Sequence, residues 1–312
     1  MNRVTLGSWP TPVQAVPRLA TAIGLGADDL WLKRDDLVGL GAGGNKVRKL
    51  EYTLGAAVAN GATAVVTTGA AQSNHARATA AAAAALGLRA VLVLGGDPPA
   101  SPVGNVLLDA LFGARLVFAG PADDAGLAAR ADAEADRLRA AGETVEVVPF
   151  GGSSVVGARA YADAGAEIEA QVPGVATVVT AVGSGGTMAG LVTALGPDRV
   201  LGVDCGAVPD PAARVAALAP GTDPCALTIR GDQVGAGYAV LTDAVRDAIG
   251  LVARTEGVVL DPVYTGRAAA GLVAAVADGT LRAGRRVVLL HSGGLPGLFG
   301  HPQAAELASS LP

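Results

Sequence analysis

Residues 62–94 read ATAVVTTGAAQSNHARATAAAAAALGLRAVLVL, and they indicate the fold class. The β-branched run Ala62–Thr68 is followed by an alanine-rich helical segment, Ser73–Leu86, and then by a second apolar run, Ala90–Leu94. Both runs are nearly all apolar rather than alternating, which is typical of parallel strands that helices cover on both faces. The stretch therefore predicts a strand–helix–strand unit of a parallel sheet.

The same rhythm continues along the rest of the chain. Further strands are expected at Arg115–Phe118, Val145–Val148, Thr177–Ala181, Val200–Asp204, Gly257–Leu260 and Arg286–Leu290. Helices are expected between them at Ala122–Ala141, Val155–Gln171, Thr187–Leu195, Ala239–Arg254 and Gly266–Ala277. This alternation predicts an α/β protein.

Eight such strands could close into a single barrel or form two doubly wound sheets. The sequence PFGGSS at Pro149–Ser154 interrupts the pattern, and glycine-rich turns occur in both halves of the chain. We therefore expect two doubly wound α/β domains with mostly parallel sheets. The ligand site should lie in the cleft between them, at the carboxyl ends of the strands.

Composition excludes several other classes of protein. The chain has 312 residues, 51% of them hydrophobic, and a formal net charge of −5. The apolar fraction is too high for a disordered chain, and the net acidity argues against a nucleic-acid partner. The most apolar stretch, Ala78–Leu94, is interrupted by Arg89, so no membrane-spanning helix is expected.

The cysteines and the N-terminus bear on the cellular compartment. Cys205 and Cys225 form no disulfide framework and fit no metal-binding spacing, so no metal site is expected. The polar start, Met1–Leu6, lacks the apolar core of a signal peptide. These features favour a reduced, cytoplasmic protein.

Lysine is unusually rare and unusually clustered. Of the 23 basic residues, 20 are arginine, and the three lysines, Lys33, Lys46 and Lys49, fall within one 17-residue window. Codon preference explains most of the excess of arginine. A lysine that remains in such an arginine-rich chain nevertheless more often has a role that needs a primary amine, which a guanidinium group cannot supply.

One of these lysines has the setting of a reactive amine. Lys46 follows the turn Gly41–Asn45, where glycines let the backbone approach a ligand, and it opens a predicted helix. The positive end of a helix dipole and partial burial both disfavour the charged form, which leaves the free amine that a Schiff base needs. The alternative is a solvated basic turn at the start of a surface helix.

Two further strand-to-helix turns could bind anions. In the first, Gly69–Arg77, the side chains of Ser73, Asn74 and His75 could bind a carboxylate, or Ser73 could simply cap the helix. In the second, residues 183–187 have the form of a phosphate cradle, with Gly183, Ser184, Gly185, Gly186 and Thr187 in succession. This turn also approaches a dinucleotide-binding motif with Asp204, but Met188 stands where the third glycine should be.

Two of the four tyrosines lie in glycine-rich or strand-end segments. Tyr238 lies in Val234–Tyr238, and Tyr264 lies in Asp261–Arg267, which follows an expected strand. A tyrosine hydroxyl can act as a general acid or base when its pKa is shifted. Either ring could instead fill a gap in the core.

Together and in this order, the motifs resemble a known family. Gly43–Glu51, Gln72–His75 and the late His291–Pro296 are similar to the pyridoxal-phosphate (PLP) enzymes of the tryptophan-synthase-β fold, fold type II. Within that fold the resemblance is to the D-cysteine desulfhydrase and 1-aminocyclopropane-1-carboxylate deaminase family, over nearly the whole chain.

The resemblance implies a role for each motif. Lys46 would carry PLP as a Schiff base, with Asn45 beside it and Asn74 on the pyridine 3′-oxygen. Gly183, Ser184, Gly185, Gly186 and Thr187 would bind the phosphate, and Thr265 and Ser292 would lie near the pyridine ring. The substrate would contact Ser73, Asn74, His75, Tyr238 and Tyr264, of which Ser73 and the two tyrosines would join Lys46 in catalysis.

The resemblance also implies interleaved domains. A large PLP-binding domain would comprise residues 1–48 and 152–312, and a small inserted domain would comprise residues 49–151. A homodimer follows from the resemblance alone.

Two positions distinguish the branches of the family. Cyclopropane-cleaving members usually carry glutamate directly after the second tyrosine and leucine after the late histidine, where this chain has Thr265 and Ser292. A carboxylate at the pyridine nitrogen makes the cofactor a deeper electron sink, which ring opening requires more than expulsion of a good leaving group does. The sequence therefore predicts α,β-elimination of D-cysteine to pyruvate, hydrogen sulfide and ammonia.

Several alternatives stay open at this point. Within the family these are 1-aminocyclopropane-1-carboxylate deamination, and elimination or replacement on another β-substituted alanine such as L-cysteate. Outside it, a nicotinamide-dependent dehydrogenase would use Gly183–Gly190 and Asp204 but would leave Lys46 unexplained. A non-catalytic protein that binds an amino acid or a cofactor would leave the reactive groups without a role.

Overall fold

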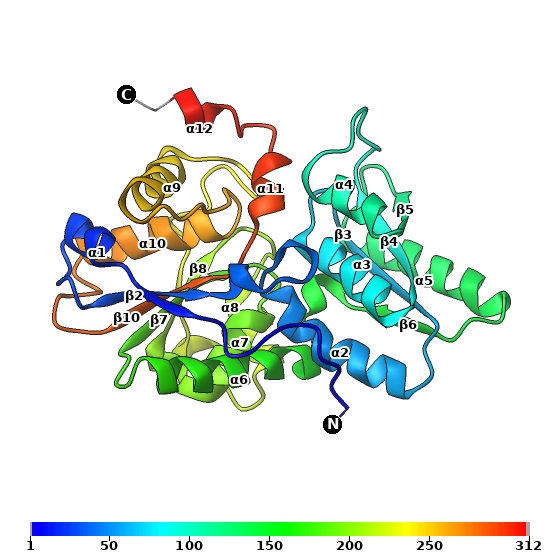
Figure 1. The fold of residues 1–312 in the computed structure, drawn as a ribbon, viewed down its shortest axis with the longest axis horizontal. Helices are drawn as coiled ribbons and strands as arrows, with labels where there is room; N and C mark the ends of the chain where they lie inside the picture. The colour runs from blue at the N-terminus through cyan, green and yellow to red at the C-terminus, as the bar shows by residue number, and fades with distance from the viewer. Residues whose placement is uncertain (1, 310–312) are drawn as a thin grey trace.

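Two open β-sheets organise the chain in the computed structural model, which describes residues 2–309 (Figure 1). The larger sheet has six strands in the order β1-β2-β10-β7-β8-β9, and only β1 is antiparallel to its neighbour. Its strands are β1 (Val13–Ala15), β2 (Leu30–Arg34), β7 (Thr177–Val182), β8 (Val200–Asp204), β9 (Thr228–Arg230) and β10 (Val287–His291).

Helices cover both faces of this sheet. One apolar core lies under α1 (Pro17–Ile23), α9 (Asp243–Glu256) and α10 (Thr265–Ala277). A second core lies on the opposite face under α6 (Val155–Gln171), α7 (Gly186–Leu195) and α8 (Pro211–Leu218). The central strands β10 and β7 are therefore buried on both sides, which explains why they are mostly apolar.

The smaller sheet is wholly parallel, in the order β5-β4-β3-β6. Its strands are β3 (Ala64–Ala70), β4 (Arg89–Gly95), β5 (Arg115–Phe118) and β6 (Val145–Val148). Helix α5 (Asp124–Ala140) packs on one face, and α2 (Lys46–Ala59), α3 (Asn74–Leu86) and α4 (Gly104–Leu111) lie on the other. The chain ends in two short helices, α11 (Leu295–Phe299) and α12 (Glu306–Ser309).

The predicted class and sheet type are confirmed, and one predicted strand is wrong. The sheets are open and mostly parallel, so the barrel is excluded. Gly257–Leu260 joins no sheet: Gly257 ends α9 in the left-handed conformation with φ +65°, and Val258 and Leu260 are buried in the core under α9 and α10. The neighbours of β10 in the sheet are β2 and β7, and both pair with it in parallel.

One of the two predicted domain boundaries, at 48/49, falls inside a helix that packs against both parts of the molecule. Residues 64–148 supply the whole smaller sheet, while the larger sheet takes strands from both flanking parts of the chain. Helix α2 crosses residue 48/49 and packs against both α3 and α6. The boundaries at 48/49 and 151/152 stay a prediction.

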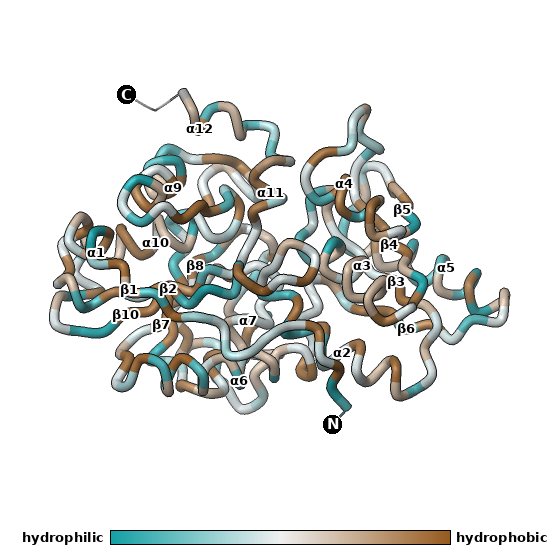
Figure 2. The backbone as a smooth tube through the Cα atoms, in the orientation of Figure 1, coloured by the Kyte–Doolittle hydropathy of each residue, from teal (hydrophilic) through white to brown (hydrophobic). Residues whose placement is uncertain are grey.

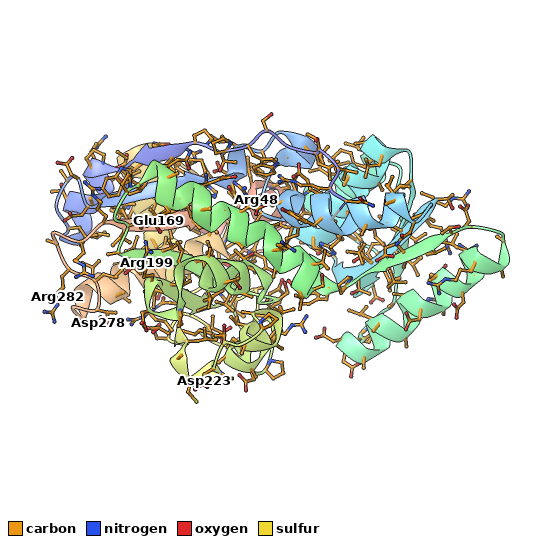
Figure 3. The ribbon with its side chains drawn as sticks, turned by 90° about the horizontal axis from the view of Figure 1, so that it is seen from below. Arg48, Glu169, Arg199, Asp223, Asp278 and Arg282 are labelled. Carbon is orange, nitrogen blue, oxygen red and sulfur yellow. The ribbon has the colours of Figure 1, made fainter. Side chains whose placement is uncertain are left out.

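A buried ionic cluster anchors α2 against the larger sheet. Arg48 donates from Nε to Asp35 Oδ2 at 2.8 Å and from Nη2 to Glu167 Oε2 at 2.7 Å. Thr11 and Tyr161 also donate to Asp35, which is fully buried. Figure 3 shows Arg48 near the middle of the molecule, in contrast to the surface pair of Arg199 and Glu169.

Lys33 belongs to the same cluster. Its ammonium group donates to the Thr11 carbonyl, to Glu167 and to Gln171 at 2.7–2.9 Å, so all three of its donors are used. A compact ammonium group matches three acceptors around one point better than a planar guanidinium does. This geometry accounts for the retention of lysine at position 33.

We expect Asp35→Ala to destabilise the fold by about 3–5 kcal/mol, because it removes the fully buried one of the two carboxylates that pair with Arg48 and leaves only the partly exposed Glu167. The free energy of unfolding can be measured by urea denaturation. Burial alone would raise the pKa of Asp35, but the charge and hydrogen bonds of Arg48 outweigh it and lower that pKa. A carboxyl with a lowered folded-state pKa stabilises at neutral pH, and this contribution is lost as the pH falls through that pKa.

Glu169→Ala is the matched control for this prediction. Glu169 pairs with Arg199 at 2.8 Å on the surface, where an ion pair contributes about 0–1 kcal/mol. Equal losses in the two variants would contradict the buried role of Asp35.

Candidate active site

The turn before α2 is fixed in a conformation that only glycine adopts easily. Gly43 has φ +74°, and a Cβ there would lie 2.2 Å from the Asp36 carbonyl oxygen. The Asn45 amide donates to the Ser292 carbonyl at 2.9 Å, which joins this turn to the one after β10. Lys46 is therefore presented from a rigid loop at the first position of α2.

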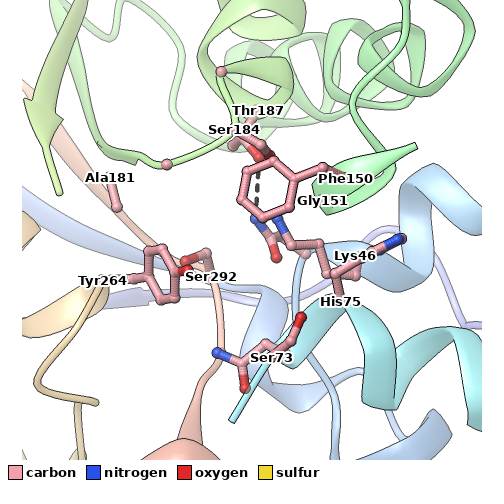
Figure 4. A pocket seen from close by; sticks show the side chains of 15 residues that line it. Lys46, Ser73, His75, Phe150, Gly151, Ala181, Ser184, Thr187, Tyr264 and Ser292 are labelled. Atoms are coloured by element: carbon pink, nitrogen blue, oxygen red, sulfur yellow. Dashed lines mark hydrogen bonds between the residues drawn. The ribbon is translucent and has the colours of Figure 1, made fainter. Parts of the chain in front are cut away.

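Lys46 lies in the wall of a pocket between the two sheets (Figure 4). Desolvation by the surrounding protein lowers the pKa of its amine to about 8, while the nearby Cys205 and Lys49 act weakly in the opposite direction. With this pKa roughly a tenth of the amine is uncharged at pH 7, which is the form that a nucleophilic lysine requires.

The lowered pKa predicts the pH profile of Lys46 in the cofactor-free protein. Only the neutral amine of Lys46 reacts with an acylating reagent, so the labelling rate should rise with pH and be half-maximal at a pH of about 8. Mass spectrometry of the peptide that contains Lys46 measures this rate. In the urea-unfolded protein the same peptide should titrate near 10.5. Identical profiles for folded and unfolded protein would contradict the assignment.

The loop between β7 and α7 lies opposite Lys46 and has the features of an anion site. Asn45 Nδ2 donates to Thr187 Oγ1 at 3.0 Å, which connects the start of α2 to the start of α7. The hydroxyls of Ser184 and Ser153 lie 2.7 Å apart. A Cβ at Gly186 would come within 2.6 Å of Ser153 Oγ and 3.0 Å of Lys49 Nζ, so any side chain there would fill the cradle.

Two cations lie at this loop without a carboxylate beside them in the described part of the chain. Lys49 is buried and donates to Ser153 Oγ at 3.2 Å. Arg214 donates to the carbonyls of Ser184 and Ser153. Burial and the charges of Lys46 and Arg214 lower the pKa of Lys49 strongly. A phosphate bound here would relieve this repulsion and accept hydrogen bonds from the N-terminus of α7.

The sequence reading missed Lys49 and Ser153 as members of the site. Lys49 follows Lys46 by three residues on a helix, which brings both amines to one face. Ser153 lies in the PFGGSS segment, which was read only as an interruption between domains. The clustering of small residues there was the available signal.

The turn between β3 and α3 supplies hydrogen-bond donors. Ser73 caps α3 by accepting from the Ala76 amide at 3.1 Å, which leaves its hydroxyl hydrogen free to donate. Asn74 accepts at Oδ1 from Asn105, so its amide hydrogens face the pocket. Ser73 can therefore cap α3 and also donate a hydrogen bond to a carboxylate, so the two roles that the sequence left open are compatible.

The two tyrosines form a hydrogen-bonded pair. Their hydroxyl oxygens lie 2.6 Å apart, and the rings meet edge to face with centroids 6.3 Å apart. Tyr264 lines the pocket of Lys46, and Tyr238 lines an adjoining cavity that also contacts Ser73 and Tyr264. Burial raises the pKa of Tyr264 well above its usual value, so its hydroxyl is protonated at neutral pH and can donate a proton.

Thr265 and Ser292 differ in their relation to the pocket. Ser292 lines it. The Thr265 hydroxyl accepts from the Asp261 amide at 2.8 Å and donates to Asp261 Oδ1 at 2.7 Å, so its only hydrogen is used in capping α10. Neither residue introduces a carboxylate into the pocket lining.

The structure brings most of the predicted site residues to one pocket. Those that line it are Asn45, Lys46, Ser73, Asn74, His75, Gly183, Ser184, Gly185, Thr187, Tyr264 and Ser292. Gly186 lies beside Ser153 and Lys49, Tyr238 bonds to Tyr264 in the pocket lining, and Thr265 bonds to Asp261 outside that lining. Asp204 instead accepts from the Gly206 amide in its own turn.

Two kinds of site have no counterpart in residues 2–309. No group of three or more His, Cys, Asp or Glu side chains is placed to bind a metal ion. None of the helices in this range is both long and apolar enough to cross a membrane.

A lysine of lowered pKa opposite a phosphate cradle, between two open α/β sheets, defines an enzyme that binds a phosphorylated aldehyde cofactor through a lysine. The family model "Pyridoxal-phosphate dependent enzyme" matches residues 4–293, and the chain belongs to this family. The protein is thus a PLP-dependent enzyme of fold type II.

Several known proteins are similar over nearly the full length. A Pyrococcus abyssi protein named "Putative 1-aminocyclopropane-1-carboxylate deaminase" is 40% identical, covering 95% of this chain and 93% of its own. The D-cysteine desulfhydrase of Salmonella schwarzengrund is 38% identical, covering 96% of each chain. A crystal structure titled as that of the ACC deaminase homologue superposes with a TM-score of 0.90 at 36% identity, covering 99% of this chain and 96% of its own.

Proposed function

We propose that the protein is a PLP-dependent carbon–sulfur lyase that eliminates hydrogen sulfide from D-cysteine to give pyruvate and ammonia. The supporting observation is the composition of the pocket: it places Lys46, Ser73 and Tyr264 together and includes no Asp or Glu among its described lining residues. Without a carboxylate near the ring, the cofactor is a shallower electron sink, which suffices for a good leaving group on the β-carbon.

Each residue would have a defined task towards the cofactor. Lys46 would hold it covalently, and the Asn74 amide would donate to its ring oxygen. The loop Gly183–Thr187 with Lys49 would bind its phosphate, because buried cations and helix N-terminal amides surround that space. When bound, PLP withdraws electrons from the α-carbon of an attached amino acid.

The remaining groups would manage the substrate and its protons. Ser73 and the N-terminus of α3 would bind the substrate carboxylate, since the Ser73 hydroxyl retains a hydrogen to donate. Lys46, as a free amine, would remove the α-proton. Tyr264 would give its proton to the departing sulfur as the Cβ–S bond breaks, and water would then hydrolyse the released enamine to pyruvate and ammonia.

A substrate panel tests this proposal. The purified enzyme is incubated with D-cysteine, L-cysteine, L-cysteate, D-serine and 1-aminocyclopropane-1-carboxylate, and sulfide, pyruvate and 2-oxobutanoate are measured. The proposal requires sulfide and pyruvate in equal amounts from D-cysteine. Formation of 2-oxobutanoate from the cyclopropane substrate with no sulfide from D-cysteine would overturn it.

The alternative, deamination of 1-aminocyclopropane-1-carboxylate, is favoured by the name of the Pyrococcus abyssi relative. It is disfavoured by Thr265, whose hydroxyl is used by Asp261, and by Ser292 at the pocket wall. The same panel detects elimination or replacement on another β-substituted alanine, such as L-cysteate. Adding a thiol then distinguishes replacement from elimination, because only replacement gives a thioether product.

We also propose that the enzyme works as a homodimer in the cytoplasm. Leu107 and Leu111 on α4 and Leu295 and Phe299 on α11 are exposed on two helices that contact each other, and Figure 2 shows both helices as hydrophobic. Cys225 is an exposed free thiol, which is typical of a reducing compartment.

The double variant Leu111→Asp/Phe299→Asp should be monomeric by light scattering, since it places charge in the proposed contact. Val58→Asp on the exposed end of α2 is the control and should leave the dimer intact. A wild-type protein that is monomeric at all concentrations would refute the dimer.

A further inference from the structure

The start of α4 is hydrogen-bonded to the turn before α3. The Asn105 backbone amide donates to Gln72 Oε1 at 2.8 Å, and Gln72 Nε2 donates to the Val103 carbonyl at 3.1 Å. Asn105 is fully buried and is the second residue of α4. These bonds hold the Asn105 side chain against the turn that carries Asn74.

The main chain determines which way the Asn105 carboxamide points. Asn105 Nδ2 donates to the Gln72 carbonyl oxygen at 2.8 Å. A carbonyl oxygen only accepts hydrogen bonds, and of the two carboxamide atoms only the nitrogen can donate. The Asn105 side-chain oxygen therefore faces away, and it has no partner in residues 2–309.

The second hydrogen of Asn105 Nδ2 determines the orientation of Asn74 in turn. Asn105 Nδ2 lies 3.0 Å from Asn74 Oδ1, and a donor at this distance requires an oxygen opposite it. If the Asn74 carboxamide turned over, two NH₂ groups would face each other and a bond at a buried side chain would be lost. Asn74 Nδ2 is therefore the atom left for the pocket, which Asn74 lines together with Lys46.

Helix α11 packs directly against this pair of carboxamides. A Cβ at Gly297 would lie 3.5 Å from Asn105 Nδ2 and 3.6 Å from Asn74 Oδ1, which is ordinary contact. A Cβ at Gly300 would lie 2.1 Å from Gln72 Oε1, so a side chain there would displace the group that caps α4. The small residues of α11 thus leave room for the hydrogen bonds that orient Asn74.

We propose that Asn105 is a positioning residue for the cofactor: by donating to the Asn74 oxygen, it keeps the Asn74 amide hydrogens turned towards the ring oxygen of PLP. This rests on the proposed function, in which Asn74 donates to that oxygen. Because the ring oxygen carries negative charge, a donor stabilises it and a carbonyl oxygen repels it. Asn105 is not among the described residues that line the pocket, so it acts through Asn74.

Asn105→Ala tests this role through the dissociation constant of PLP, measured by titrating the cofactor-free protein. The variant keeps the backbone amide that Gln72 caps but leaves Asn74 free to turn over. We expect the dissociation constant to rise about 5-fold, the effect of one hydrogen bond. Val106→Ala is the control: this residue is nearly as buried on the same helix, and its variant should bind PLP as the wild type does.

A double-mutant cycle separates positioning from a general loss of structure. Asn74→Ala removes the group through which Asn105 acts, so adding Asn105→Ala to it should leave the dissociation constant of PLP unchanged. Effects that simply add in the double variant would overturn the inference, as would wild-type binding in Asn105→Ala.

Asn105→Asp should reverse the polarity at nearly constant shape. Its carboxylate accepts from Asn74 Nδ2, which turns the Asn74 carbonyl towards the ring oxygen. We expect weaker PLP binding than in Asn105→Ala, by about 10-fold or more relative to the wild type, and a shifted visible absorption of the bound cofactor. Tighter binding in Asn105→Asp than in Asn105→Ala would contradict the proposed polarity.

Nuclear magnetic resonance tests the wild-type protein without any change at Asn105. The chain has five asparagines, so ¹⁵N in their side chains gives five pairs of amide signals, and Asn74→Ala identifies one pair. One Asn74 hydrogen should shift when PLP binds, whereas the Asn105 pair should stay in place because both its hydrogens are already bonded. Unmoved Asn74 signals would refute the inference. None of these measurements needs a substrate, so they stand or fall independently of D-cysteine turnover.

Discussion

Lys46→Ala is expected to abolish covalent attachment of PLP and to lower kcat for D-cysteine by a factor of ~10³ or more, the largest functional effect of any single substitution. Lys46 is the pocket lysine whose pKa is lowered to about 8, and we assign it both the covalent link and the removal of the α-proton. Borohydride reduction fixes the cofactor to the amine that carries it. Mass spectrometry should then find the added mass on the Lys46 peptide of the wild-type protein and on no peptide of the variant.

Lys49→Ala is the matched control, because Lys49 lies one helical turn further along the same face. This variant should keep the covalent link and the visible absorption, but it should bind PLP more weakly, since it removes a buried cation from the phosphate cradle. Added mass on Lys49 of the wild-type protein, or an unchanged absorption band in Lys46→Ala, would contradict the assignment.

The fold was predictable from sequence where strands are buried on both faces. Runs such as Thr177–Ala181 and Arg286–Leu290 are mostly apolar because helices cover both sides of β7 and β10. The short edge strands β1 and β9 have only three residues each and give no such signal. Strand β2 includes Lys33, which pairs with the distant Glu167, and Arg34, which pairs with Asp36, so its charged residues conceal a strand that lies between β1 and β10.

The site was predictable wherever glycine or a cap fixes the backbone locally. The turns at Gly43, Ser73 and Gly185 lie in the structure where the strand-to-helix pattern placed them. Lys49 could not be recognised as part of the cradle, because its role depends on Ser153, which is 104 residues away. The hydrogen bond between His75 and Thr67 likewise joins α3 to β3, and Thr67 reaches the Val148 carbonyl only through the pairing of β3 with β6.

Tyr264→Phe is expected to separate substrates by their leaving groups. Burial keeps the Tyr264 hydroxyl protonated, and in the proposed function this hydroxyl gives its proton to the departing group. We expect kcat for D-cysteine to fall by about 10²-fold, within the usual range for loss of a general acid. For β-chloro-D-alanine, whose chloride leaves without a proton, kcat should stay within a few-fold of wild type. D-serine should suffer most, since hydroxide is the poorest leaving group of the three.

Tyr238→Phe is the control that distinguishes proton donation from packing. Tyr238 is 38% exposed and bonds to Tyr264 through the two hydroxyls, so its loss should have a smaller effect with the same order of substrates. If Tyr264→Phe lowered kcat equally for D-cysteine and β-chloro-D-alanine, the hydroxyl would serve to place the substrate rather than to protonate sulfur. The ratio of the two rates therefore reports on the proton that Tyr264 donates, because binding contacts common to both substrates cancel in it.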